Sequence, residues 1–136
     1  MNTSRPLIAV VDDEESVRKA LKRLLRSAGM DVETFDSGTK FLVEFPALKL
    51  DCLVLDLHMP GVTGFGVLAT IGGRVPVVVI TGQDSSENRE RAMDGGAVAY
   101  LRKPVAAAAL IEAITDAVAR FKADAATSAA TPNVVG

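Results

Sequence analysis

The chain has 136 residues, 49% of them hydrophobic and 24% charged, which fits a single globular domain. Its 15 Lys and Arg residues against 17 Asp and Glu residues give a formal charge of −2, which argues against direct nucleic-acid binding. No apolar stretch approaches the ~20 residues of a membrane helix, and no signal-type region follows the N-terminus, so we expect a cytoplasmic protein without a membrane segment. Cys52 lies in an apolar run and is interpreted as a buried, unreactive thiol.

The first third of the chain alternates predicted strands and helices. Residues 7–11 form a short apolar run rich in branched side chains, which is typical of a buried strand. Residues 13–28 carry apolar side chains at a helical spacing, which predicts a helix with one buried stripe. Residues 32–35 alternate apolar and polar side chains as an edge strand does, and Ser37 is placed to cap a short helix that ends at Pro46.

The rest of the chain repeats this alternation. The predicted elements are a strand at 52–55, a short helix around 65–71, a strand at 75–80, a polar helix at 86–94, a strand at 98–101 and a helix at about 106–121. Five strands alternating with five helices predict βαβ units, so we expect a doubly wound α/β fold with a parallel sheet and helices on both faces. Residues 123–136 have little to bury and are interpreted as a disordered tail or a linker.

Polar residues stand at the ends of four predicted strands. Asp12 and Asp13 follow the first strand, Asp56 the third and Thr81 the fourth, and Lys103 lies just beyond the fifth. In parallel α/β sheets, ligands bind beyond the carboxyl ends of the strands, where the strand order reverses. With a strand order of 2-1-3-4-5, all five side chains would meet at one edge of the sheet.

Such a cluster predicts a specific chemistry. Three carboxylates in a small volume repel one another and must be neutralised by a cation or by protons. Oxygen ligands without Cys or His partners at zinc spacing favour Mg²⁺ or Mn²⁺. A metal and a lysine around a carboxylate are suited to phosphoryl transfer, in which an Asp can be the nucleophile. Each residue alone has a simpler explanation, such as a helix cap for Asp12 and Asp13 or a turn for Asp56, so the signal lies in their coincidence.

These residues resemble the receiver domain of two-component response regulators. The resemblance covers residues 5 to about 122 and rests on the acidic pair after the first strand, residues 56–64, Thr81-Gly82 and residues 100–104. Several of these segments are most similar to receivers of the FixJ type. The resemblance implies a CheY-like (βα)5 fold, related to flavodoxin, with a five-stranded parallel sheet of order 2-1-3-4-5.

The resemblance also implies how the acidic residues act. Asp56 would accept a phosphoryl group from the phosphohistidine of a histidine kinase. Asp13, Asp56 and the backbone carbonyl of His58 would ligate Mg²⁺ directly, and Asp12 would act through water. The domain would not be an enzyme for other substrates: it would catalyse only its own phosphorylation and dephosphorylation, the latter at a rate tuned by side chains such as His58 and Gln83.

The remaining site residues would read out the phosphoryl group. By the same resemblance, Thr81 and Lys103 would contact the phosphoryl oxygens, and the Lys103-Pro104 peptide bond would be cis. Tyr100 would turn inward when Thr81 is drawn to the phosphate. The polar helix at 86–94 has little to bury beyond Ala92 and Met93, so we expect it to be weakly held and to shift together with the fifth strand and helix.

The implied partners are a sensor histidine kinase or phosphotransfer protein and an output domain or effector that is not in this chain. The sequence fits either a stand-alone receiver or a piece of a longer regulator, and a phosphorylation-dependent homodimer stays open. The basic face of the first predicted helix either steers an acidic kinase surface or is simply solvated; its residues are Lys19, Lys22, Arg23 and Arg26.

Three other functions compete with this interpretation. A flavodoxin-like electron carrier would need aromatic side chains to stack on a flavin, yet the chain has no Trp and one Tyr. A phosphatase of the haloacid dehalogenase type would carry Asp-x-Asp after the first strand, where this chain has Asp12-Asp13. A receiver-shaped module that is never phosphorylated would generally lack one of the five site residues.

Two features depart from the receiver pattern: the segment between Asp56 and Thr81 is short, and Val105 stands where an aromatic residue is common.

Overall fold

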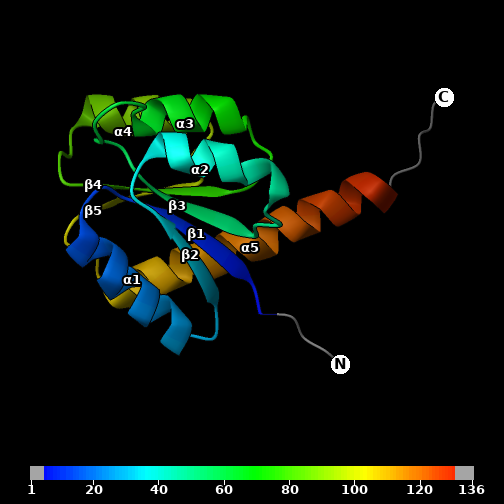
Figure 1. Cartoon of the computed structure of the whole chain (residues 1–136). Coiled ribbons are helices and arrows are strands. Elements are labelled where there is room, and N and C mark those ends of the chain that lie inside the picture. Colours follow the sequence, from blue (N-terminus) through cyan, green and yellow to red (C-terminus); the bar gives the residue numbers. More distant parts are fainter. Residues whose placement is uncertain (1–4, 131–136) are drawn as a thin grey trace.

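The computed structural model describes residues 5–130, with the side chains of residues 5–126 (Figure 1). The strands are β1 (Leu7–Val11), β2 (Asp31–Phe35), β3 (Cys52–Asp56), β4 (Val77–Thr81) and β5 (Ala99–Arg102). The helices are α1 (Glu15–Ser27), α2 (Gly38–Glu44), the short 3-10 helix η1 (Phe45–Ala47), α3 (Gly64–Ile71), α4 (Ser86–Asp94) and α5 (Ala107–Ala130). The strands form a parallel sheet in the order β2-β1-β3-β4-β5, which confirms the predicted fold class and strand order.

The sheet separates two hydrophobic layers, because successive residues of a strand point to opposite faces. In β1, Ile8 and Val10 pack in the layer that includes Leu25 of α1 and helix α5. Ala9 and Val11 face the other layer, which holds the buried residues of α2, α3 and α4. Figure 1 shows this division, with α1 and α5 on one side of the sheet and α2, α3 and α4 on the other. The prediction of helices on both faces is confirmed.

Local capping explains where the shorter helices begin and end. The Ser37 hydroxyl accepts a hydrogen bond of 3.1 Å from the backbone N–H of Lys40, so Ser37 caps α2 as predicted. Ser85 caps α4 in the same way, with a bond of 3.0 Å from the N–H of Asn88. Gly72 ends α3 with a left-handed φ of 59°, a conformation that a glycine adopts without strain.

The last helix is longer than the sequence pattern predicts. The structure continues α5 to Ala130, so residues 123–130 of the segment interpreted as a disordered tail or a linker are helical, and residues 131–136 lie outside the described part. Alanine, the best helix former, dominates this stretch, and neither Gly nor Pro interrupts it before Pro132. Such a segment can extend a helix without a buried stripe. Within residues 5–130, neither α5 nor any other helix is long and apolar enough to cross a bilayer.

Two side chains that the pattern predicts to be buried are exposed. Phe121 ends the apolar stripe at helical spacing formed by Leu110, Ile111, Ile114, Val118 and Phe121, yet it is 37% exposed, and Ala117 is buried on α5 instead. Met93 is 42% exposed, because it lies about 100° around the helix from Ala92, which is the buried residue of α4. By contrast, Cys52 is fully buried as predicted, and burial raises the pKa of its thiol to about 12, which keeps it unreactive.

Candidate functional site

Three carboxylates gather where β1 and β3 end. These two strands are parallel neighbours with Val11 paired to Leu55, so the residues that follow them lie side by side. One oxygen from each of Asp12, Asp13 and Asp56 lies within 4.8 Å of the others. Asp12 and Asp56 are buried, whereas Asp13 is exposed. The predicted meeting of the three acidic residues is therefore found.

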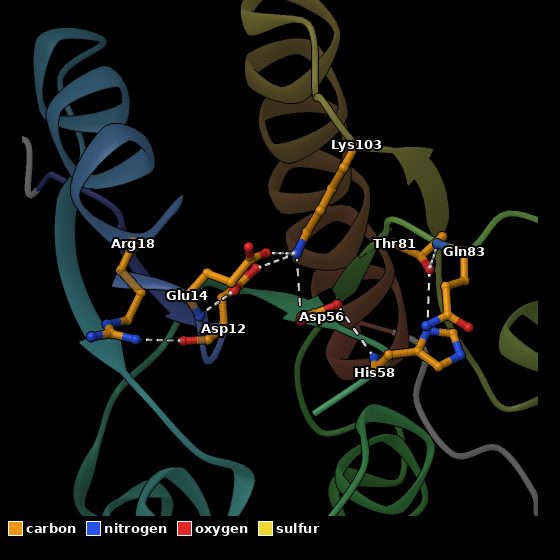
Figure 2. Close-up of polar contacts among 8 residues, drawn as sticks. All are labelled: Asp12, Glu14, Arg18, Asp56, His58, Thr81, Gln83 and Lys103. Carbon is orange, nitrogen blue, oxygen red and sulfur yellow. Dashed lines mark hydrogen bonds and ion pairs between the residues drawn. The ribbon is translucent and has the colours of Figure 1, made fainter. Parts of the chain in front are cut away.

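Lys103 reaches this cluster from beyond β5, as Figure 2 shows. Its Nζ lies 2.8 Å from Asp12 Oδ2, 3.2 Å from Glu14 Oε1 and 3.5 Å from Asp56 Oδ2. Burial acts to lower the pKa of Lys103, but the surrounding carboxylates, Asp12 foremost, outweigh it and raise that pKa. The ammonium group therefore stays charged. The contact with Glu14 was not predicted, since a third acidic residue in a row looks like an ordinary helix start.

Burial makes Asp56 an unusual carboxylate. Desolvation, with the negative charge of Asp12 adding to it, raises the pKa of Asp56 to about 6, although Lys103 opposes the shift. The backbone N–H of His58 donates a hydrogen bond of 3.3 Å to Asp56 Oδ1. The negative charge of an ionised Asp56 is thus only partly balanced by Lys103 and the His58 N–H. Additional positive charge at this place would favour the ionised form, which is the nucleophilic one.

The oxygen atoms of Asp12 fit a site for a hard cation. Asp12 Oδ1 accepts a hydrogen bond of 2.8 Å from the backbone N–H of Glu14. The buried Oδ2 is ion-paired with Lys103 Nζ at 2.8 Å, and beyond that ion pair it accepts no hydrogen bond from the described residues. Neither Asp12 nor Asp13 caps α1, because the N-cap position is Glu14. An oxygen-only ligand set suits Mg²⁺ or Mn²⁺, bound directly or through water.

Thr81 joins the site through His58. Thr81 ends β4 next to Asp56, whose partner in the neighbouring strand is Ile80. The Thr81 hydroxyl oxygen accepts a hydrogen bond of 2.9 Å from the backbone N–H of Gln83 and lies 3.3 Å from His58 Nδ1 (Figure 2). The sequence predicted a site role for the backbone carbonyl of His58 and left its ring as one of several tuning groups. The ring contact with Thr81 was missed, because it depends on the path of the loop after β3.

A glycine fixes that loop against the end of β3. The Gly64 N–H donates to the carbonyl of Leu57 at 3.0 Å. A Cβ at Gly64 would collide with the backbone of Asp56 and Leu57, so only glycine allows this approach. Thr63 caps α3, which has 8 residues, and this short helix accommodates the short segment between the site residues of β3 and β4. The position of Asp56 is thus set by backbone packing.

Tyr100 and Pro104 lie on the β5 side of the site. Tyr100 is 6% exposed, and its buried hydroxyl has no hydrogen-bond partner among the described residues. The guanidinium of Arg89 lies 5.3 Å from the centre of its ring. The Lys103-Pro104 peptide bond is cis, as predicted. All predicted site residues therefore lie at the carboxyl edge of the sheet or on the strand that leads to it.

Comparisons with known proteins agree with this geometry. The family model of the response regulator receiver domain matches residues 8–115. The response regulator protein TmoT of Ectopseudomonas mendocina is 36% identical over 120 residues, which cover 86% of this chain and 54% of that protein. The transcriptional regulatory protein FixJ of Rhizobium meliloti is 37% identical over 110 residues, which cover 79% of this chain and 54% of FixJ. The chain spans about half the length of the curated relatives it matches.

Solved structures give the same result. The crystal structure of a response regulator receiver protein from Burkholderia phymatum is 41% identical, with a TM-score of 0.77. The match covers 85% of this chain and 96% of that one, so the likeness extends over nearly the whole receiver protein. The resemblance found in the sequence is confirmed.

Proposed function

Because the chain belongs to the family of response regulator receiver domains, we propose that it accepts a phosphoryl group on Asp56 from a sensor histidine kinase or phosphotransfer protein. The observation that carries the proposal is that two further carboxylates and an ammonium group lie close to Asp56. Oxygens of Asp12, Asp13 and Asp56 lie within 4.8 Å of one another, and Lys103 Nζ lies 3.5 Å from Asp56 Oδ2. A buried carboxylate between a cation site and an ammonium group is arranged for nucleophilic attack on a phosphoryl group.

The proposed reaction uses an Asp56 carboxylate oxygen as the nucleophile. A bond forms between this oxygen and phosphorus while the bond from phosphorus to the donor's imidazole nitrogen breaks, and the imidazole leaves with that electron pair. Lys103 and the Thr81 hydroxyl are proposed to contact the phosphoryl oxygens and balance their charge. Hydrolysis by water would return Asp56 to its free form. The protein would thus act only on its own phosphoryl group, as a signalling domain rather than as an enzyme for other substrates.

The metal is proposed to be Mg²⁺ or Mn²⁺. Asp13, Asp56 and the backbone carbonyl of His58 would hold it directly, and Asp12 through water. The oxygen-only ligands and the short spacing of the three carboxylates support this assignment. When bound, the metal supplies positive charge to the transferring phosphoryl group. The residues of the chain orient Asp56 for attack and keep it poised beside Lys103.

The signal is proposed to leave through α4, β5 and α5. Because α4 buries only Ala92, it is held by few apolar contacts and is easily shifted. Tyr100 is proposed to respond when Thr81 is drawn toward the phosphoryl group. The output would be an effector or an output domain outside this chain, either alone or as a phosphorylation-dependent homodimer. We keep residues 5–122 as the proposed extent of the cytoplasmic receiver domain.

Acetyl phosphate tests the proposal without a kinase. The unsubstituted protein with Mg²⁺ should gain the mass of one phosphoryl group, and a chelator should prevent this. Asp56→Asn should abolish the adduct, whereas Asp36→Asn should retain it, because Asp36 follows β2 at the same sheet edge but pairs with Lys40 instead. An adduct that persists in Asp56→Asn would place the acceptor elsewhere. No adduct in the unsubstituted protein would favour a receiver-shaped module that is not phosphorylated.

A further inference from the structure

The ring of His58 connects the proposed phosphorylation site to α4. Its Nδ1 lies 3.3 Å from Thr81 Oγ1 (Figure 2). The same ring meets the ring of Phe65 edge-on, with 6.5 Å between the centroids. The guanidinium carbon of Arg91 lies 3.9 Å from the centroid of Phe65. Thr81, His58, Phe65 and Arg91 thus form a continuous series of contacts from β4 through the loop after β3 and α3 to α4.

The direction of the first contact depends on which ring nitrogen of His58 carries the proton. The Thr81 hydroxyl oxygen already accepts a hydrogen bond of 2.9 Å from the Gln83 N–H. The hydroxyl has a single proton to donate. With the His58 proton on Nε2, the ring nitrogen Nδ1 is an acceptor, and the Thr81 proton is directed to it. The proposed contact of Thr81 with a phosphoryl oxygen requires that same proton, so His58 and the phosphoryl group compete for it.

We infer that His58 carries its proton on Nε2 and is a positioning residue: it holds the Thr81 hydroxyl in the unphosphorylated protein and transmits the release of that hydroxyl to α4 through Phe65 and Arg91. The inference rests on the proposed function and adds a route to α4 that does not pass through Tyr100. When Thr81 turns to the phosphoryl group, the His58 ring loses its hydrogen bond and is free to turn against Phe65. The ring of Phe65 is the surface on which Arg91 rests.

The attachment of α4 makes it sensitive to such a change. Ala92 is the buried residue of this helix, and the rest of its side chains are exposed or half-buried. Two arginines of α4 lie over aromatic rings of the domain: Arg91 over Phe65 and Arg89 over Tyr100. Contacts between a cation and an aromatic face are attractive even at exposed positions. With so little apolar contact, a change at Phe65 alters a large share of what holds α4.

Beryllofluoride, a tetrahedral stand-in for the phosphoryl group, tests the competition directly. Its dissociation constant is measured at saturating Mg²⁺, so that changes in metal affinity do not enter. His58→Phe keeps an aromatic ring beside Phe65 but removes the partner of Thr81, and it should tighten beryllofluoride binding about fivefold, the factor expected for one ordinary hydrogen bond. His58→Asn can place an acceptor where Nδ1 stands, and it should restore binding to within about twofold of the unsubstituted protein. Equal or weaker binding by His58→Phe overturns the inference.

Amide exchange of α4 tests the second half of the route. Arg91→Gln should speed exchange in α4 several-fold in the free protein, while the matched Arg23→Gln on exposed α1 surface should not. Beryllofluoride should change exchange in α4 of the unsubstituted protein, and this change should shrink in His58→Asn, which lacks a ring to move against Phe65. An equal change in both proteins overturns the route through Phe65.

The outcomes separate this inference from the proposed function. If the unsubstituted protein forms no acetyl phosphate adduct and binds no beryllofluoride, both fail together. If it binds beryllofluoride with normal affinity and the His58 variants leave that affinity and α4 exchange unaltered, only the inference fails. The nitrogen chemical shifts of His58 give an independent check, since Nδ1 must be the unprotonated nitrogen in the free protein.

Discussion

The interior of the sheet and its carboxyl edge are built in opposite ways. Strand β3 shows the contrast within a few residues, because 52–55 are apolar and fully buried while the next residue, Asp56, is charged and only 2% exposed. Burial of apolar side chains stabilises the fold, whereas burial of neighbouring carboxylates opposes it. The interior therefore supplies stability, and the edge gives up some of that stability to keep reactive groups close together.

The largest expected effect comes from the interior. Leu25 of α1 is fully buried against the sheet, so Leu25→Ala removes apolar contacts and leaves a cavity. We expect the free energy of unfolding to fall by about 3 kcal/mol in chemical denaturation. The control is Val43→Ala, at a position that is 73% exposed, which should change it by less than about 0.5 kcal/mol. If both variants lost a similar free energy of unfolding, burial would not explain the stability of the interior.

At the edge, removal of a charge should have the opposite sign. In metal-free buffer at pH 7, Asp56→Asn should raise the free energy of unfolding by about 2 kcal/mol, because the folded protein no longer holds a desolvated carboxylate. The pKa of Asp56 is about 6 in the folded protein, above that of an exposed Asp. The Asp56 carboxyl therefore binds its proton more tightly in the folded protein than in the unfolded chain. The stabilisation that this gives at pH 4 is lost as the pH rises through 6.

Denaturation curves at pH 4.5 and 7.5 with a chelator would measure how far the free energy of unfolding falls with pH. In Asp56→Asn, the part of this fall that comes from Asp56 should be absent. Saturating Mg²⁺ should cancel the advantage of the variant, since a bound cation stabilises the ionised Asp56 and binds only the folded protein. A variant that is less stable than the unsubstituted protein in the metal-free state would show that Lys103 compensates Asp56 fully. The contrast between interior and edge would then disappear.

The same contrast explains how much of the molecule could be predicted. The apolar strands and the polar residue at each strand end are local patterns, and parallel pairing brings those ends together whatever the loops do. Asp12, Asp13, Asp56 and Lys103 were therefore placed correctly. The extent of α5 was missed because the lack of a buried stripe suggested a tail, whereas alanine propensity favours a continued helix.

Contacts made by long side chains and loops could not be predicted. The pairing of Glu14 with Lys103 spans 89 positions and depends on side-chain rotamers at the mouth of the site. The contact of His58 with Thr81 depends on the loop that Gly64 holds against β3. Periodicity and strand ends contain no information about either.

A smaller effect is expected on the outer face of α1. The basic face consists of Lys19, Lys22, Arg23 and Arg26. Of these, Lys19 already pairs with Glu15 at 3.1 Å. Reversal of the charges at the other three positions should slow phosphotransfer from an active histidine kinase several-fold at low salt, with less effect at high salt. Phosphorylation by acetyl phosphate, which needs no docking, is the control. An unchanged rate of phosphotransfer at low salt would mean that this face is only solvated.

The smallest effect concerns the number of partners that Lys103 can hold. Its ammonium group has three N–H donors, and three carboxylates surround it: Asp12 at 2.8 Å, Glu14 at 3.2 Å and Asp56 at 3.5 Å. A phosphoryl oxygen that contacts Lys103 would therefore compete with these carboxylates. Glu14 is the easiest to release, because its side chain is 59% exposed and water can replace the lysine.

Glu14→Gln should therefore strengthen beryllofluoride binding, but only about twofold to threefold, because an exposed ion pair contributes little free energy. Glu15→Gln is the matched control: it removes the same charge one residue along α1, where Glu15 pairs with Lys19 and not with Lys103. If both variants strengthened binding equally, the cause would be net charge rather than competition for Lys103. If Glu14→Gln weakened binding, Glu14 would be a residue that aligns the lysine. The edge would then be organised by its outermost carboxylate as well as by its buried ones.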